Sequence, residues 1–512
     1  MNDRLSRLQL SPSAAVKQQL DYPVIDTDVH VNDYTPDLED YVSNYGGVHL
    51  VDHLRKASAD RTARGGISNG KNWYEQTPEE RQYYRTIRSP WWARVTKNTL
   101  DVATYHLPEL FAERQAEQGS DYSVLFPNNV LAPLGVRDKD SRTALSRAIN
   151  HYHADLWRKH SAHLTPVAGI PLHTPEEGLA ELDFAINTLG LKAINIAGSV
   201  SRPIKALAEK FPLDQHPELR KYISYQDFLG LDSEYDYDPF WARVVELGVP
   251  ILTHYGSQGW TGRSSISNYM NNHIGHFADG TEAFAKALFF GGVTKRFPKL
   301  RAGFLEGGAD WGARVYIHLA DRFEKRSRKG LENYDPRATD RAQLTALFKE
   351  YGADLVKDRD IEGEALIRDT LGKGYTSDAR RPKDEELEDF AASGVQSVED
   401  IKSRWVDNFF FGSESDDRTI AHAFNTKANP LGVNINAIYS SDVGHWDVPD
   451  LTHALAEAHA LVEDGLITEA NFKAYVFENP YRLYTEANAD FFKDTVVEQK
   501  LKGAPTTART TA

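Results

Sequence analysis

Apolar residues along this chain gather into eight short runs, separated by longer stretches with helical spacing. The runs are rich in β-branched and aromatic residues, which is typical of buried strands. Between several of them, apolar positions recur with the period of an amphipathic helix, as over 141–159, 176–189 and 450–464. The predicted strands are Val24–Val31, Tyr122–Pro127, Leu164–Leu172, Ala193–Ile196, Val249–Gly256, Arg301–Gly308, Asn408–Glu414 and Asn436–Asp442.

Regular alternation of strands and helices predicts an α/β protein with a parallel sheet. Eight such repeats predict a closed (β/α)8 barrel, the TIM barrel. A doubly wound open sheet is the alternative, but no Gly-x-Gly-x-x-Gly loop follows the first run. With 512 residues, of which 41% are hydrophobic, the chain can build one large core. We therefore expect a single barrel over residues 20–497.

Three stretches are longer than a barrel needs. Residues from about 46 to 118 are charged and aromatic, and residues from about 203 to 238 form a second aromatic, acidic stretch. Both follow predicted strands, on the side where barrel enzymes place their sites, so we predict that they are lids. Residues from about 325 to 404 are charged and helical in pattern, which indicates a solvated helical insertion. The polar residues 500–512 are predicted to be a disordered tail.

The first predicted strand ends with a carboxylate and an imidazole, those of Asp28 and His30. Strand residues two apart point to the same side, so the two groups leave the backbone together. Among buried valines and isoleucines they need a partner for charge. A divalent cation would satisfy both, whereas a hydrogen-bonded structural pair is the simpler alternative.

Three later strands end in the same manner. His254 closes the fifth strand, Glu306 closes the sixth, and Asp442 closes the eighth, with His445 just beyond it. In a parallel barrel the carboxyl ends of all strands meet at one face. The sequence therefore predicts a metal site at this face, and its predicted ligands are Asp28, His30, His254, Glu306 and Asp442.

Composition narrows the possible partners and ligands. A formal net charge of -15 argues against nucleic acid or an anionic membrane as a partner. The chain has no cysteine, so disulfides and thiolate metal sites are excluded and any metal must be bound through nitrogen and oxygen. No apolar run has the length of a membrane span, and we expect a cytoplasmic protein that acts on a small molecule.

These features resemble the amidohydrolase superfamily, in the amidohydrolase-2 (ACMSD-like) branch. The resemblance lies in the opening Ile-Asp-x-x-x-His strand, the strand-five His254, the Phe-Pro-x-Leu-Arg lead at 297–301, and a strand-eight Ser-Asp followed by His445. It extends from about Tyr22 to Val497. It implies a barrel with a metal site, in a family that commonly assembles into homo-oligomers or pairs with a homologous subunit.

Two positions depart from the pattern of that superfamily. Asp28 and Glu306 stand where its members usually carry histidine. Carboxylate-rich sites suit hard ions such as manganese and iron better than zinc. Three carboxylates also carry much of the negative charge needed by two divalent ions, or by one with a bridging hydroxide. We expect iron or manganese, with two ions per chain favoured and zinc as the alternative.

The favoured function is a dinuclear non-haem iron/manganese monooxygenase that uses O₂ on a small amine or hydrocarbon-like substrate, because the sequence resembles that subset of the branch. The alternative is a mononuclear manganese- or zinc-dependent hydrolase, or a non-oxidative decarboxylase of a small aromatic acid. A catalytically silent barrel serving as a partner subunit is a third interpretation. Five convergent polar groups argue against it, because a silent barrel has no need of them.

Two further histidines are candidate catalytic residues. His445 lies three residues after Asp442, where it could transfer a proton or simply orient that carboxylate. His276 and His273 share one face of a predicted helix after strand five, and His276 is the better placed of the two. An apolar substrate pocket is a further hypothesis, with packing as the alternative, and its predicted lining is Trp91, Trp92, Tyr255, Trp260 and Trp446.

Overall fold

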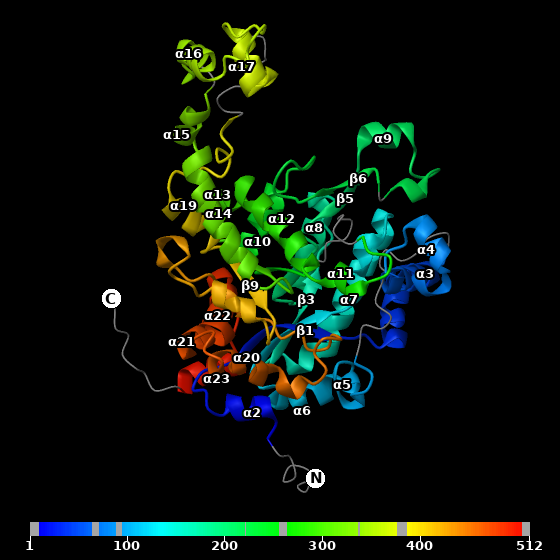
Figure 1. The fold of residues 1–512 in the computed structure, drawn as a ribbon. Coiled ribbons are helices and arrows are strands. Elements are labelled where there is room, and N and C mark those ends of the chain that lie inside the picture. Colours follow the sequence, from blue (N-terminus) through cyan, green and yellow to red (C-terminus); the bar gives the residue numbers. More distant parts are fainter. Residues whose placement is uncertain are drawn as a thin grey trace.

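The computed structural model describes residues 10–63, 71–88, 95–220, 222–254, 264–335, 338–375 and 387–503. Its centre is an eight-stranded sheet in the order β1-β2-β3-β4-β7-β8-β9-β10 (Figure 1). Each strand pairs in parallel with the next one in this order. All eight predicted strands are therefore confirmed, as β1 (Ile25–Val31), β2 (Tyr122–Pro127), β3 (Leu164–Gly169), β4 (Ala193–Ile196), β7 (Ile251–Thr253), β8 (Ala302–Phe304), β9 (Phe409–Ser413) and β10 (Ala437–Tyr439).

Strands β1 and β10 close the barrel without a regular ladder. A bridge between Val29 and Val443 joins them, and the N–H of Asp442 donates to the carbonyl of Asp28 at 3.1 Å. The Thr27 hydroxyl donates to the Tyr439 carbonyl at 2.6 Å. Strand β1 has an irregularity of register between residues 26 and 29 in its pairing with β2. The fold is thus a (β/α)8 barrel whose last seam is formed where β1 and β10 carry polar side chains.

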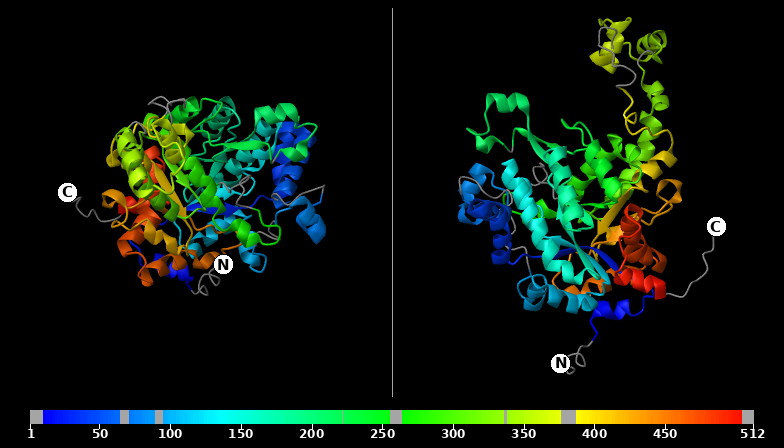
Figure 2. Two further views of the ribbon diagram at one scale, coloured as in Figure 1. Left: turned by 45° about the horizontal axis from the view of Figure 1, so that its top comes forward. Right: turned by 180° about the vertical axis from the view of Figure 1, so that it is seen from behind.

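Helices connect the strands and pack against the outside of the barrel (Figures 1 and 2). Their apolar faces explain this packing: in α10, Phe240, Trp241 and Val244 are almost fully buried. The helices are α2 (Pro12–Lys17), α3 (Thr35–Ala63), α4 (Pro78–Tyr84), α5 (Thr99–Thr104), α6 (Pro108–Gln118), α7 (Lys139–Trp157), α8 (Pro175–Asp183), α9 (Lys205–Lys210), α10 (Asp238–Leu247), α11 (Tyr269–His273), α12 (His276–Phe290), α13 (Val293–Arg296), α14 (Asp310–Arg326), α15 (Arg328–Leu331), α16 (Arg341–Tyr351), α17 (Glu364–Leu371), α19 (Val398–Trp405), α20 (Ala454–Glu463), α21 (Glu469–Lys473), α22 (Asn479–Ala487) and α23 (Val496–Gly503).

The inside of the barrel is filled by side chains that alternate with outward-facing ones. Along β2, Val124 and Phe126 belong to the inner cluster, whereas Leu125 packs outward with Trp157. Tyr484 of α22 and Phe492 join the inner cluster near the start of β2. Because the interior is packed, the polar ends of the strands are left at the carboxyl face.

The segment after β4, part of which is predicted to be a lid, contains strands of its own. It forms an antiparallel hairpin of β5 (Val200–Pro203) and β6 (Ser224–Asp227), with α9 at its far end. A buried ion pair between Arg202 and Asp227 stabilises the hairpin, and Arg202 also donates to the Tyr237 hydroxyl at 2.9 Å. This pairing across 25 residues is not visible as a local sequence signal.

The chain between β8 and β9 contains α15, α16 and α17, which project away from the barrel (Figures 1 and 2). Near the C-terminus, residues 500–503 belong to α23, so the helix extends into the predicted disordered tail. The rest of that tail lies outside the described residues. Within the described ranges, the structure contains no helix that is both long and apolar enough to span a membrane.

Candidate metal centre

Strand β1 supplies the first two side chains of the centre. Asp28 and His30 both lie in the extended strand, two residues apart, and are 0% and 4% exposed. The His30 Nε2 atom lies 3.3 Å from Asp28 Oδ1. The apolar strand buries both groups, so neither can rely on water for its charge. This is the placement that the Asp-x-His pattern predicts.

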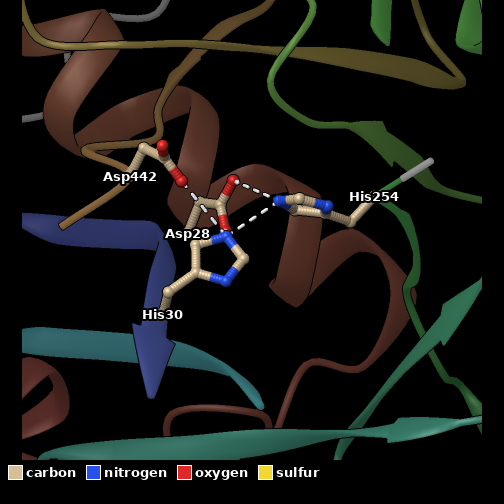
Figure 3. A group of neighbouring side chains, drawn as sticks. All are labelled: Asp28, His30, His254 and Asp442. Carbon is tan, nitrogen blue, oxygen red and sulfur yellow. Dashed lines mark hydrogen bonds and ion pairs between the residues drawn. The ribbon is translucent and has the colours of Figure 1, made fainter. Parts of the chain in front are cut away.

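His254 follows β7 and faces His30 across the barrel mouth (Figure 3). The two Nε2 atoms are 2.8 Å apart, and the rings meet edge to face. The backbone N–H of His254 donates to the side-chain oxygen of Asn195, which fixes the end of β7. Two imidazole nitrogens at this distance cannot both carry hydrogen. At least one presents a lone pair, as a metal ligand does.

The carboxylates after β8 and β10 come from residues with unusual backbone conformations. Glu306 has φ +54° and Asp442 has φ +57°, both in the left-handed region that non-glycine residues rarely adopt. Glu306 Oε2 lies 3.3 Å from His254 Nε2, and Asp442 Oδ1 lies 3.1 Å from His30 Nε2. The backbone therefore turns sharply at both positions and aims the carboxylates at the two histidines.

His445 completes the cluster from the loop after β10. Its Nδ1 lies 2.9 Å from Glu306 Oε1 and 2.8 Å from Asp442 Oδ1. Its ring stacks on the ring of His30 with 3.5 Å between centroids. Gly444 allows this close approach, since a Cβ there would lie 2.2 Å from the carbonyl oxygen of His30.

The donor atoms of these residues fit a bound cation. One group of ligand atoms within 4.8 Å of one another comes from Asp28, His30, His254 and Asp442, and a second comes from His30, Glu306, Asp442 and His445. Among the described residues, one buried oxygen of each of Asp28, Glu306 and Asp442 has no hydrogen-bond partner apart from the imidazole nitrogens of the cluster. Carboxylate oxygens buried in this way need a positive charge nearby. The cluster is therefore suited to a metal ion bound by nitrogen and oxygen.

Burial and mutual charge shift the pKa values in opposite directions. Burial raises the pKa of Asp442 to about 8, against the nearby positive charge of His445. Burial raises the pKa of Asp28 too, but His254 and His30 outweigh this, and the net shift is downward. Although burial lowers the pKa of His445, the carboxylates of Asp442 and Glu306 raise it well above its usual value. Without metal, the cluster thus holds protons mainly at its β8 and β10 side.

Comparison with known proteins identifies the family. Residues 25–356, more than half of the chain, match the sequence profile of the family described as amidohydrolase. The chain belongs to the amidohydrolase family. The predicted resemblance is confirmed, and with it the barrel fold and a metal-dependent enzyme as the class of protein. No curated protein matches the chain.

Several solved structures are similar to this amidohydrolase family member over most of its length. A 2,6-dihydroxybenzoate decarboxylase from Rhizobium is 15% identical, with 91% of this chain and 99% of that chain covered and a TM-score of 0.44. A 5-carboxyvanillate decarboxylase from Novosphingobium aromaticivorans, crystallised with manganese, is 13% identical, with 91% and 96% covered and a TM-score of 0.47. An amidohydrolase from Mycobacterium avium subsp. paratuberculosis is 16% identical, with 91% and 100% covered and a TM-score of 0.48.

The structure brings together the five predicted ligands and His445, but it places His276 differently. His276 begins α12, is 5% exposed, and its Nδ1 lies 2.5 Å from the carbonyl oxygen of His273. It belongs to none of the ligand groups found among the described residues. The ring of its neighbour Phe277 lies 4.0 Å from that of His276 and 5.5 Å from that of His254. A catalytic role of His276 stays a prediction.

Two residues near the centre did not emerge from the sequence. Glu414 directly follows β9, and its carboxylate is close to those of Asp442 and Asp447. Burial, together with the charge of Asp442, raises the pKa of Glu414 to about 10. Its position at a strand end was a usable signal, because it matches those of Glu306 and Asp442. The second residue, Asn128, follows β2 and contacts His445, and no sequence pattern marks an asparagine as such a partner.

Aromatic rings surround the histidines of the centre. Phe126 and Phe277 each lie 5.5 Å from the ring of His254, in different orientations. Trp446 packs against His273 with 5.3 Å between centroids. The other predicted lining residues lie outside the described residues, namely Trp91, Trp92, Tyr255 and Trp260. The described part of the mouth therefore combines a charged centre with apolar walls.

Proposed function

We propose that this protein is a manganese-dependent, redox-neutral decarboxylase of a small aromatic carboxylic acid. The observation that carries the proposal is the position of His445. Its Nδ1 lies within 3 Å of the Glu306 and Asp442 carboxylates, and Asp442 also belongs to the group of four ligands formed with Asp28, His30 and His254. The proposal follows the alternative function derived from the sequence, and it is supported by the description of the family as amidohydrolase, a name for redox-neutral chemistry.

In this proposal Asp28, His30, His254 and Asp442 hold the metal ion. Their two carboxylates and two imidazoles suit manganese, because carboxylate ligands favour hard ions. When bound, the ion would bind and polarise a substrate carboxylate as a Lewis acid. The role of the four residues is to fix that carboxylate at the mouth of the barrel, with its ring between the apolar walls.

Decarboxylation requires a proton donor beside the metal ligands. When the bond between the ring carbon and the carboxylate breaks, the electron pair stays on that carbon and carbon dioxide leaves. The carbon then takes up one proton, and no oxidant or reductant is needed. The hydrogen-bonded pair of His445 and Glu306 holds such a proton, at Nδ1 of His445. The carboxylates around it keep the imidazole charged until the substrate carbon becomes the stronger base.

Apolar surroundings fit this reaction better than hydrolysis. Phe126 and Phe277 flank His254, and His30 is covered by the ring of His445. Such walls offer area to a planar substrate and exclude water from a developing carbanion. A hydrolase would instead need an attacking water at the same place.

The test is an anaerobic assay of manganese-loaded protein with a panel of hydroxybenzoates, measuring carbon dioxide release and, in D₂O, deuterium in the product. We expect carbon dioxide and one deuterium per turnover without O₂. The variant His445→Gln should bind manganese normally and lose about 10²–10⁴-fold in turnover, the usual contribution of a general acid. Turnover only in the presence of O₂, or hydrolysis of amides or esters without carbon dioxide release, would contradict the proposal.

One observation favours a second candidate, a dinuclear oxygenase. The two ligand groups share His30 and Asp442, and the second group adds Glu306 and His445. Two overlapping groups offer ligands for two adjacent ions, as dinuclear oxygen-activating sites require. This candidate predicts two iron or manganese ions per chain and O₂ consumption, and His445 would then be a ligand rather than a proton donor.

A further inference from the structure

Two pairs of polar residues face each other where β1 and β2 end. Asn32 and Asp33 follow β1, and Asn128 and Asn129 follow β2, continuing the register that pairs Val31 with Pro127. The Asn128 side-chain N–H donates to the Asn32 side-chain oxygen at 2.7 Å. One residue further on, the Asn129 side chain donates to the Asp33 carboxylate. The two loops are thus joined by two neighbouring side-chain hydrogen bonds.

The first of these two links reaches the metal centre. The Asn128 side-chain oxygen lies 3.3 Å from Nε2 of His445. Because the amide nitrogen of Asn128 is bound to Asn32, its oxygen is the atom that faces the imidazole. An amide oxygen only accepts, so Nε2 must carry the hydrogen in this contact. The opposite nitrogen, Nδ1, faces the Glu306 and Asp442 carboxylates.

We propose that Asn128, held in place by Asn32, is a positioning residue that fixes the His445 ring with Nε2–H on Asn128 and Nδ1 toward Glu306 and Asp442. Rotating the ring by half a turn would replace Nδ1 by a carbon atom at the carboxylates and would leave Nε2 without its acceptor. Asn32 is 3% exposed, so its bond to Asn128 is protected from water. The contact holds the active orientation whether Nδ1 carries a proton or binds a metal ion, as outer hydrogen bonds of ligand histidines do.

The second link leads away from the centre and provides a matched control. Asp33 lies 2.6 Å from Nε2 of His153 on α7, and the two side chains are 3% and 1% exposed. Asn129 therefore connects the same two loops as Asn128, but its partner Asp33 pairs with His153, which is not a residue of the centre. Loss of either amide should affect the loops similarly, whereas only the loss of Asn128 should release His445.

This inference rests on the proposed function only in taking His445 as part of the site. Its test therefore uses no substrate. In protein labelled with ¹⁵N-histidine and loaded with Zn²⁺ alone, the His445 signals are assigned by their absence in His445→Gln. We expect a slowly exchanging Nε2–H signal of His445 in wild type. Asn128→Asp keeps an acceptor for Nε2–H and can accept a hydrogen bond from the Asn32 side-chain amide once that amide turns, so it should retain the signal, whereas Asn128→Leu should lose it.

Asn129→Leu should show the wild-type signal and the same shift in melting temperature as Asn128→Leu. If Asn128→Leu fails to fold, Asn32→Ala serves instead, and its His445 Nε2–H should exchange at least tenfold faster than in wild type. An unchanged His445 signal in Asn128→Leu or Asn32→Ala, or an equal loss in Asn129→Leu, would overturn the inference. A lack of decarboxylase activity would count against the proposed function and leave this result untouched.

Discussion

The two sides of the metal centre are built in different ways. On one side, Asp28 and His30 project from a regular strand, and His254 directly follows one. On the other side, Glu306 and Asp442 occupy left-handed backbone positions after their strands. The strand side is oriented by the sheet itself, whereas the turn side depends on local strain that the surrounding packing must maintain.

The pKa values of the carboxylates on the two sides are shifted in opposite directions. The pKa of Asp28, on the strand side, is lowered because neighbouring histidines outweigh its burial. The pKa of Asp442, on the turn side, is raised to about 8 because burial dominates. Asp28 on the strand side is therefore ionised and can bind a cation, whereas Asp442 on the turn side keeps its proton in the absence of metal. A site that must both hold a metal ion and deliver a proton needs this asymmetry.

The largest expected effect comes from removing His30, which belongs to both ligand groups. His30→Ala should reduce manganese binding to the level of adventitious binding, because it removes the nitrogen ligand that both groups share. Isothermal titration of metal-free protein with Mn²⁺ measures this. His276→Ala, which alters a buried histidine outside both groups, is the control and should bind manganese as wild type does. Comparable binding by both variants would show that the described cluster is not the site.

A pH titration should distinguish the two sides. Asp442, with its pKa raised to about 8, must lose its proton to bind a metal ion, so manganese affinity should rise with pH up to about 8 and then level. Below that pH the affinity should fall about tenfold per unit for one displaced proton. Asp28 is already ionised and contributes no such dependence. A flat affinity between pH 6 and 8 would contradict the assignment of protons to the turn side.

The hydrogen bonds between Ser441 and Asp26, which lie next to the two sides of the centre, should contribute measurably to the free energy of unfolding. Ser441 donates from its hydroxyl to Asp26 at 2.5 Å and from its N–H to the same carboxylate at 3.1 Å, and both residues are fully buried. Ser441→Ala should lower the free energy of unfolding by about 1–3 kcal/mol, because it leaves a buried carboxylate oxygen with one donor fewer. Urea unfolding measures this, with the exposed Ser403→Ala as control, expected within about 0.5 kcal/mol of wild type. Equal stability of the two variants would contradict it.

The smallest expected effect is on the difference in stability between a glycine and an alanine variant, which should have opposite signs at Glu306 and at Asp28. At Glu306, with φ +54°, glycine should be more stable than alanine by about 1 kcal/mol, since only alanine is strained there. At Asp28, in the middle of β1, alanine should be more stable than glycine by about 0.5–1 kcal/mol. Both pairs lack the carboxylate, so urea unfolding of the four metal-free variants isolates the backbone term. The same order at both positions would show that the backbone at Glu306 is not strained.

The strand side was also the more predictable side. The Asp-x-His spacing in β1 follows from the period of a strand, and the later ligands stand where apolar runs give way to polar residues. The positions of Asp28, His30, His254, Glu306 and Asp442 could therefore be expected. The left-handed backbone at Glu306 and Asp442 could not, since nothing local distinguishes it. Likewise, the Asn128 contact joins residues 317 positions apart and depends on the closure of the whole barrel.

Metal analysis of protein purified aerobically tests the central claim most directly. We expect plasma mass spectrometry to find about one divalent ion per chain, manganese, as required for a single Lewis-acid site that does not change its oxidation state. Two ions per chain with iron among them would contradict it and would favour an oxygen-activating centre at the same residues.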